Sequence, residues 1–118
     1  MSVIFLTRDL MFSSRVAGAA KQHGVALETV GDAPAALARC EQGDVALVIA
    51  DPSTAGLDIA ALVQALDQFA ASRPRVIAFA PHVHEAKLEV AAQAGCDEVL
   101  SRGQFNTRAE QIVAAYRQ

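Results

Sequence analysis

The side chains of this 118-residue sequence that could do chemistry lie directly after short apolar runs. Asp51 follows the run at residues 46–50, and its carboxylate could bind a divalent cation or accept a phosphoryl group. Asp9 offers a second carboxylate after the N-terminal apolar run. Arg8, beside it, carries a fixed positive charge and can bind a carboxylate through two N–H groups. These residue types indicate metal, phosphoryl or ion-pair chemistry.

Several motifs of known catalytic sites are absent from the sequence. No G-x-G-x-x-G follows the first apolar run, and neither G-x-x-x-x-G-K-[ST] nor G-x-S-x-G occurs anywhere. The sequence therefore gives no support to a dinucleotide site, a P-loop or a Ser-His-Asp hydrolase. His82 and His84 could share a metal only in an extended loop and lack an evident third ligand, so a solvated loop is the preferred interpretation.

Five apolar runs of strand length must position these side chains. Residues 3–6, 46–50 and 76–80 are continuously apolar, which is typical of strands covered on both faces in a parallel sheet. Residues 25–30 and 98–100 are weaker candidates, and we expect them at the sheet edges.

The segments between these runs take on the spacing of amphipathic helices. Asp32 and Asp58 are the expected N-caps of two of them. The residues expected to end four of the helices are Gly24, Gly43, Pro74 and Gly95. A fifth helix is predicted over residues 107–116.

Strand and helix alternate five times, which predicts an α/β fold: a (βα)5 doubly wound parallel sheet between two layers of helices. Connections are short and no linker is evident, so we expect one domain over residues 1–118 without an output domain. Functional residues of such sheets lie at the carboxyl ends of the central strands. The site is therefore expected where Asp51 lies.

The composition limits the classes of function. Hydrophobic residues make up 53% of the chain, which excludes disorder, and no apolar run approaches the roughly 20 residues that span a bilayer. The formal charge is −3, whereas phosphate binding needs clustered Lys and Arg, so we expect neither nucleic acid nor a membrane as partner. No basic segment precedes the N-terminal apolar run, and the two cysteines lie far apart. These features predict a cytoplasmic protein.

The stretch AAQAGCDEVL at residues 91–100 resembles the fourth helix and fifth strand of response-regulator receiver domains of bacterial two-component systems. The resemblance covers essentially the whole chain and places Asp51 at the family's phosphoacceptor aspartate. It implies a CheY-like, flavodoxin-like fold with strand order 2-1-3-4-5. In typical members, a histidine kinase supplies the phosphoryl group that this aspartate accepts.

The sequence departs from the family at most other positions of that site. Thr7 and Arg8 stand where typical receivers have two acidic residues that hold Mg²⁺. Ala80 replaces the switch serine or threonine, and Val99 replaces the aromatic switch residue. Arg102 replaces the family's lysine. Of the site that the resemblance implies, only the phosphoacceptor aspartate is kept.

We expect Arg8 to take the place of the metal and to pair with Asp51, with help from Arg102. Asp51 with Thr7 as a weak neutral ligand is a poor Mg²⁺ site, so no metal or other cofactor is predicted. Two alternatives stay open. Asp51 merely ends a strand and caps the following loop, or Asp9, which more naturally caps the first helix, joins Asp51 in a non-standard Mg²⁺ site.

The leading hypothesis is a pseudo-receiver, a non-enzymatic signalling domain that acts through protein contact, independently of Mg²⁺-dependent aspartyl phosphorylation. The resemblance also suggests a homodimer through the fourth helix, fifth strand and fifth helix. Met11 and Phe12 are adjacent on the first helix and cannot both face the sheet, so one of them is expected at a partner surface. The alternatives are a stand-alone response regulator phosphorylated at Asp51 and a small-ligand sensor or enzyme of flavodoxin-like fold.

Overall fold

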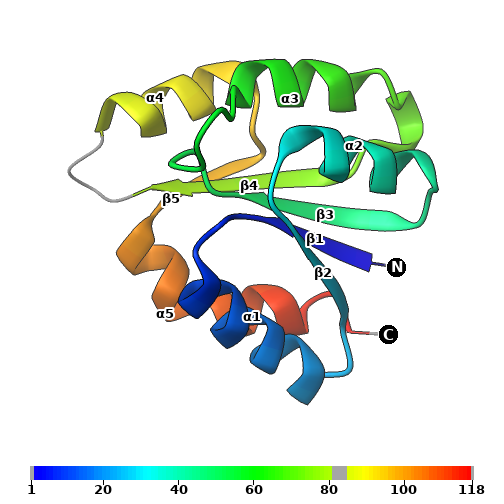
Figure 1. Cartoon of the computed structure of the whole chain (residues 1–118), viewed down its shortest axis with the longest axis vertical. Helices are drawn as coiled ribbons and strands as arrows, with labels where there is room; N and C mark the ends of the chain where they lie inside the picture. Colours follow the sequence, from blue (N-terminus) through cyan, green and yellow to red (C-terminus); the bar gives the residue numbers. More distant parts are fainter. Residues whose placement is uncertain (1, 81–84, 118) are drawn as a thin grey trace.

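The computed structural model describes residues 2–80 and 85–117 (Figure 1). Its centre is a parallel five-stranded sheet in the order β2-β1-β3-β4-β5, which confirms the predicted fold class and strand order. The strands are β1 (Ser2–Leu6), β2 (Ala26–Val30), β3 (Val45–Ala50), β4 (Arg75–Ala80) and β5 (Glu98–Ser101). The helices are α1 (Leu10–Gln22), α2 (Ala33–Glu41), α3 (Ile59–Asp67), the short 3-10 helix η1 (Ala70–Ser72), α4 (Glu85–Ala94) and α5 (Arg102–Ala114).

The burial of the strands follows their place in the sheet. Every residue of β1 is buried, as are the last four residues of β3 and the last five of β4. β2 has no buried residue, and β5 has only Leu100. Only central strands are covered by helices on both faces, and this explains why the continuous apolar runs are central and the weaker ones form the edges.

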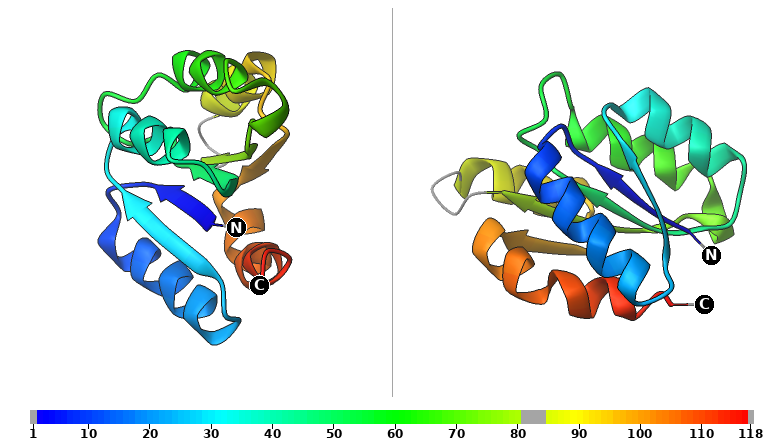
Figure 2. Two further views of the ribbon diagram at one scale, coloured as in Figure 1. Left: turned by 90° about the vertical axis from the view of Figure 1, so that its right-hand side faces the viewer. Right: turned by 60° about the horizontal axis from the view of Figure 1, so that its bottom comes forward.

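The helices form a layer on each face of the sheet. α1 and α5 lie side by side on one face, and α2, α3 and α4 cover the other (Figures 1 and 2). The α1–α5 side holds an aromatic cluster whose neighbouring ring centroids are 4.4 to 6.0 Å apart, formed by Phe5, Phe12, Phe79 and Phe105. The opposite side is packed with aliphatic side chains. The two halves of the core are therefore chemically different.

Aspartate side chains begin three of the helices. Asp9 accepts a hydrogen bond from the backbone N–H of Phe12, and Asp32 and Asp58 accept equivalent bonds at the starts of α2 and α3. These bonds satisfy N–H groups that have no partner within the helix. The predicted caps are thus confirmed.

Within the described residues, none of the helices combines the length and apolar character needed to cross a bilayer.

Two helix boundaries differ from the sequence-based predictions. α5 begins at Arg102, five positions before the predicted start, because Ser101 and Gln104 form a reciprocal capping box with N···O distances of 3.1 and 2.9 Å. α3 ends at Asp67 rather than at Pro74. Ala70 then takes a left-handed φ of 52°, which an α-helix cannot contain, and the chain continues as the short helix η1.

Candidate functional site

The predicted site residues gather at the carboxyl edge of the sheet, on the left in Figure 1. Leu6, the last residue of β1, is in register with Ala50, the last residue of β3. Thr7 and Asp51 are therefore neighbours across the two central strands. The parallel topology brings together residues that are 44 positions apart in the sequence.

Asp51 is held by neutral hydrogen-bond donors. It is only 6% exposed, and its Oδ2 accepts a hydrogen bond of 2.9 Å from the Thr7 hydroxyl. Its Oδ1 accepts bonds from both the backbone N–H and the hydroxyl of Ser53. The backbone of Asp51 is also fixed, because its N–H donates to Leu6 O at 3.0 Å. Both carboxylate oxygens are thus already bonded, and Ser53 is a partner that the sequence analysis did not identify.

Ser53 could have been found from its spacing. A serine two residues after an aspartate is placed to donate its backbone N–H to the carboxylate in an Asx turn. Its N–H does so at 3.0 Å, and the hydroxyl of the same residue adds a second bond. This geometry agrees with the alternative in which Asp51 caps the loop after β3.

The predicted pairing of Arg8 with Asp51 is wrong. Arg8 is exposed, and its Nε donates a hydrogen bond of 2.9 Å to the backbone carbonyl of Gly31, on the β2 side of β1. No ion pair joins Arg8 to Asp51 in the part of the chain that the structure describes. The reason is directional: successive side chains of an extended segment point to opposite sides, and Thr7 takes the position facing Asp51.

Arg102 does not reach Asp51 either, which corrects the second part of that prediction. Its Nη2 donates to Asp9 Oδ2 at 2.6 Å, and its guanidinium carbon lies 5.0 Å from the centroid of the Phe12 ring. Asp9 meanwhile accepts from Phe12 N through Oδ1 and donates its own N–H to the Thr7 hydroxyl. The arginine therefore ties the start of α5 to the start of α1.

These bonds lower the pKa of the Asp9 carboxyl below its ordinary value. The largest cause is the hydrogen bond from the Phe12 N–H, followed by the bond from Arg102. Because the pKa is lowered in the folded state, the stabilisation is present above the ordinary aspartate pKa. It is lost as the pH falls through the lowered value.

Arg102→Gln is expected to raise the pKa of Asp9 toward its ordinary value, because the substitution removes a charged donor. An NMR titration of the Asp9 carboxyl carbon measures this shift directly. Arg15→Gln is the matched control, since Arg15 lines the same groove without donating to Asp9. An unchanged Asp9 pKa in the Arg102 variant would contradict the assigned ion pair.

The residues at this edge do not fit Mg²⁺. The ion prefers several oxygen ligands in octahedral geometry, usually including carboxylates. Asp51 is bonded to Thr7 and Ser53, while Asp9 is bonded to Phe12 N and Arg102. Among residues 2–80 and 85–117, no group of three or more His, Cys, Asp or Glu side chains could hold a metal ion. A shared Asp9–Asp51 site would also place the ion next to the Arg102 guanidinium that is paired with Asp9, and like charges oppose such a site.

The remaining predicted positions contribute no chemical group to Asp51. Ala80 ends β4, is fully buried and has no hydroxyl to offer. Val99 is half-buried in β5. His82 and His84, for which a solvated loop is the preferred interpretation, lie outside the described residues.

Both cysteines are free and lie away from this edge of the sheet. Cys40 is buried and Cys96 is half-buried. Burial raises the pKa of both thiols, that of Cys96 to about 11. Neither is poised as a thiolate nucleophile.

An open groove lies between the starts of α1 and α5, next to the Asp9–Arg102 pair. Its volume is about 570 Å³. Its lining includes Asp9, Met11, Phe12, Arg15, Arg102 and Gly103. The adjacent Met11 and Phe12 indicated in the sequence that one of them is at the surface. The groove could not be predicted, because its other wall is the first turn of α5, whose early start was not predicted.

No protein-family model matches the sequence, and no curated protein matches it at a significant level. Solved structures do match. The receiver domain of the response regulator Ssk1 from Saccharomyces cerevisiae, solved with the histidine phosphotransfer protein Ypd1, gives a TM-score of 0.82 at 10% identity. That match covers 98% of this chain and 88% of the other.

Two further structures agree with this result. A signal receiver domain of a response regulator from Bermanella marisrubri has a TM-score of 0.81 and 18% identity, with 98% of both chains covered. The beryllofluoride-activated NtrC4 receiver domain dimer has a TM-score of 0.76 and 13% identity, again with 98% of both chains covered. At these identities the likeness is one of fold.

Proposed function

This chain has the fold of response-regulator receiver domains, and we propose that it is an atypical receiver. In this proposal it is a non-enzymatic signalling domain that acts by binding another protein, and it does not depend on Mg²⁺-dependent phosphorylation of Asp51. The observation that carries the proposal is the environment of Asp51. Neutral donors from Thr7 and Ser53 bond to both carboxylate oxygens, and the carboxylate of Asp9, the other acidic residue expected at this site, is paired with Arg102.

The chemistry of phosphoryl transfer supports this interpretation. Transfer to a carboxylate depends on positioning and on neutralising the charge of the phosphoryl oxygens, for which a metal ion is the usual means. Arg8 and Arg102 are the two cations that the sequence analysis expected beside Asp51. Arg8 is instead bound to Gly31 O, and Arg102 is bound to Asp9. Neither neutralises charge at Asp51. Ala80 also has no side-chain hydroxyl that could hydrogen-bond to a group attached to Asp51.

Binding to another protein is a function that a domain of this fold can perform without phosphoryl transfer. The Ssk1 receiver was solved with a partner protein, and the NtrC4 receiver was solved as a dimer. A homodimer of this chain through α4, β5 and α5 stays a prediction. On that face Glu98 pairs with Arg75 at 3.5 Å and with Arg108 at 2.7 Å within one chain. Charged groups already paired in the monomer give such a dimer few new ionic contacts.

The experiment is incubation with acetyl phosphate and Mg²⁺, followed by intact-mass measurement. We expect no added phosphoryl group, whereas a typical receiver treated in parallel supplies the positive control. A mass increase of one phosphoryl group that is absent in Asp51→Asn would overturn the proposal. That outcome would instead support a stand-alone response regulator phosphorylated at Asp51, the alternative favoured by the position of this aspartate at the end of β3.

A further inference from the structure

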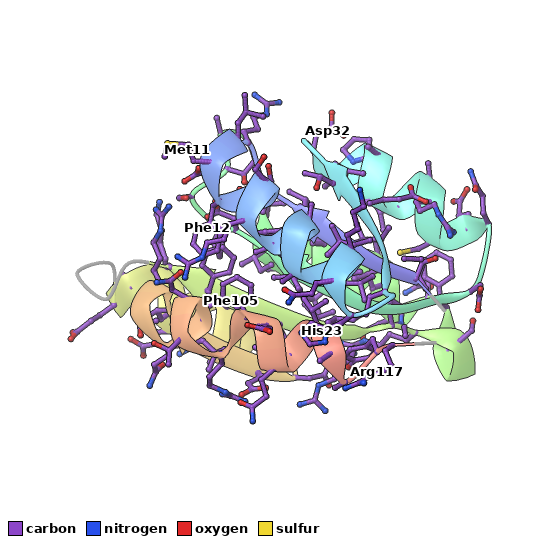
Figure 3. All side chains as sticks on the ribbon, turned by 90° about the horizontal axis from the view of Figure 1, so that it is seen from below. Met11, Phe12, His23, Asp32, Phe105 and Arg117 are labelled. Carbon is purple, nitrogen blue, oxygen red and sulfur yellow. The ribbon has the colours of Figure 1, made fainter. Side chains whose placement is uncertain are left out.

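A second open groove lies between the starts of α3 and α4. Its volume is about 380 Å³. Pockets that hold small ligands typically have volumes of roughly 300–1,000 Å³. Phe12 and Phe105, which Figure 3 labels between α1 and α5, lie on the other face of the sheet. The groove is therefore separate from the one next to the Asp9–Arg102 pair.

The walls of this groove are aliphatic. Leu57 and Ile59 line it at the start of α3, and Ala86 and Val90 line it on α4. Val90 is 51% exposed and is one of the few large apolar side chains that the described part of the chain leaves open to water. Covering such a side chain with an apolar ligand is favourable, because its surface is removed from water. The lining therefore suits the hydrocarbon part of a ligand.

The wall on the α3 side is held by hydrogen bonds of its own backbone. The Leu57 N–H donates to Thr54 O at 3.1 Å, and the Thr54 N–H donates to Asp51 O at 3.0 Å. Pro52, which also lines the groove, lies within the same loop. A ligand thus meets a wall that is already in place, and this lowers the cost of binding. Contact with Pro52 also brings the ligand against the loop that holds Asp51.

Lys87 is the positive residue of the lining. It is exposed and has no ion-pair partner among residues 2–80 and 85–117. Glu85 and Glu89 are each two positions away from it along α4, and side chains at that spacing do not face each other. Val90, three positions onward, shares the face of Lys87. Asp58, the acidic residue of the lining, already accepts a hydrogen bond at the start of α3. The charge that is left to pair with a ligand is therefore positive.

A second copy of this chain is a poorer occupant. Asp58 lines the groove, and Glu85 and Glu89 are on the same helix as Lys87. Two-fold pairing through the groove would bring these carboxylates of both copies into one interface, and like charges in an interface oppose association. A small ligand that carries one carboxylate pairs with Lys87 and leaves the acidic groups in water.

We propose that the groove between the starts of α3 and α4 binds a small aliphatic carboxylic acid in its ionised form. The hydrocarbon chain lies against Leu57, Ile59 and Val90. The carboxylate pairs with Lys87. The start of α4, where N–H groups without a partner in the helix favour negative charge, adds to this attraction.

An aliphatic chain fits this groove better than a flat ring does. The described residues that line it include no aromatic side chain on which a ring would stack. Such a site goes beyond the proposed function, since it adds a small ligand to a domain that acts by protein contact.

The probe is octanoate, and its binding is followed through amide chemical shifts in two-dimensional NMR spectra. Octan-1-ol has the same chain without a charge, and octylammonium has it with the opposite charge. We expect octanoate to give saturable shifts in the millimolar range at the starts of α3 and α4 and in the loop after β3. Octan-1-ol should bind about fivefold more weakly, which is the contribution of an exposed ion pair. Octylammonium should not saturate over the same range.

Variants of the protein separate the charge from the apolar wall. Lys87→Gln is expected to weaken octanoate binding about fivefold and to leave octan-1-ol binding unchanged, because it removes only the charge. Lys87→Arg should retain most of the affinity for octanoate. Val90→Ser should weaken the binding of both ligands, since it removes a wall that they share.

Two matched controls change α1, on the other face of the sheet. Lys21→Gln removes the charge of an exposed lysine, and Met11→Ser removes an apolar side chain that is 86% exposed. Both variants should bind octanoate normally.

Four results would contradict this inference. They are the absence of saturable shifts with octanoate in the millimolar range, equal affinity for octanoate and octylammonium, unchanged octanoate binding by Lys87→Gln, and shifts centred on the groove between α1 and α5. Sedimentation that reveals self-association abolished by Val90→Ser would make a second copy the occupant. Acetyl phosphate labelling of Asp51 is measured without any of these ligands. A failure of this site is therefore distinguishable from a failure of the proposed function.

Discussion

Thr7→Asp is expected to make the stability of this protein depend on Mg²⁺. The Thr7 hydroxyl donates to Asp51 at 2.9 Å, and Asp51 is 6% exposed. The substitution removes that donor and puts two carboxylates next to each other. Two like charges about 4 Å apart repel by about 4 kcal/mol at an effective dielectric constant near 20. We therefore expect a loss of about that size in the free energy of unfolding at pH 7 in EDTA.

Mg²⁺ should restore much of this loss, because the variant has the paired carboxylates that the ion prefers. A ligand at about 100 times its dissociation constant stabilises the folded state by about 2.7 kcal/mol. Urea denaturation with EDTA and with Mg²⁺ measures both effects. Thr7→Val is the control, since it removes the donor without adding charge; it should cost about 1–3 kcal/mol and show no response to Mg²⁺. Equal stability of Thr7→Asp in EDTA and Mg²⁺ would contradict this account of the site.

Phe105→Ala is expected to destabilise the fold by about 3–5 kcal/mol, the usual cost of removing a buried aromatic ring. Phe105 is fully buried, and its ring stacks on Phe79 with the centroids 4.4 Å apart and an interplanar angle of 9°. It also contacts Phe5 and Phe12 at 6.0 and 5.5 Å. The ring therefore joins α5 to two central strands and to α1.

The measurement is equilibrium unfolding in urea, monitored by circular dichroism. If Phe105→Ala does not fold, Phe105→Leu provides a milder variant with an expected loss between that of alanine and zero. Met11→Ala is the matched surface control, and its exposed position predicts a change within about 0.5 kcal/mol. A loss below about 1 kcal/mol in Phe105→Ala would show that the aromatic cluster does not hold α5 in place.

Local signals in the sequence predicted most of the fold. The continuous apolar runs at the positions of β1, β3 and β4 indicated central strands, because only strands covered on both faces need no polar side. Asp32 and Asp58 identified helix starts, since a carboxylate caps N–H groups three residues onward. The start of α5 was predicted late. The first turn of α5 is mostly polar, so no helical spacing of apolar residues marks the start of this helix.

The position of Asp51 and the absence of a paired acidic residue could be read from the sequence, through its resemblance to receivers. Which groups bond to Asp51 could not. The charges in the sequence favoured Arg8 as the partner of Asp51. In the structure Asp51 accepts hydrogen bonds from Thr7 and Ser53, and Arg8 donates to Gly31 O. Residue type records what a side chain can bind but not the direction in which the backbone points it.

Local patterns of residues thus predicted most of the elements, their order along the chain and the lack of an acidic residue at positions 7 and 8. Folding of the whole chain is needed to bring Asp9 and Arg102 together, because they are 93 positions apart, and to form the open groove between the starts of α1 and α5. Both features depend on how α1 and α5 pack side by side on one face of the sheet. That meeting is set by packing of the rings beneath them, and no local pattern of residues encodes it.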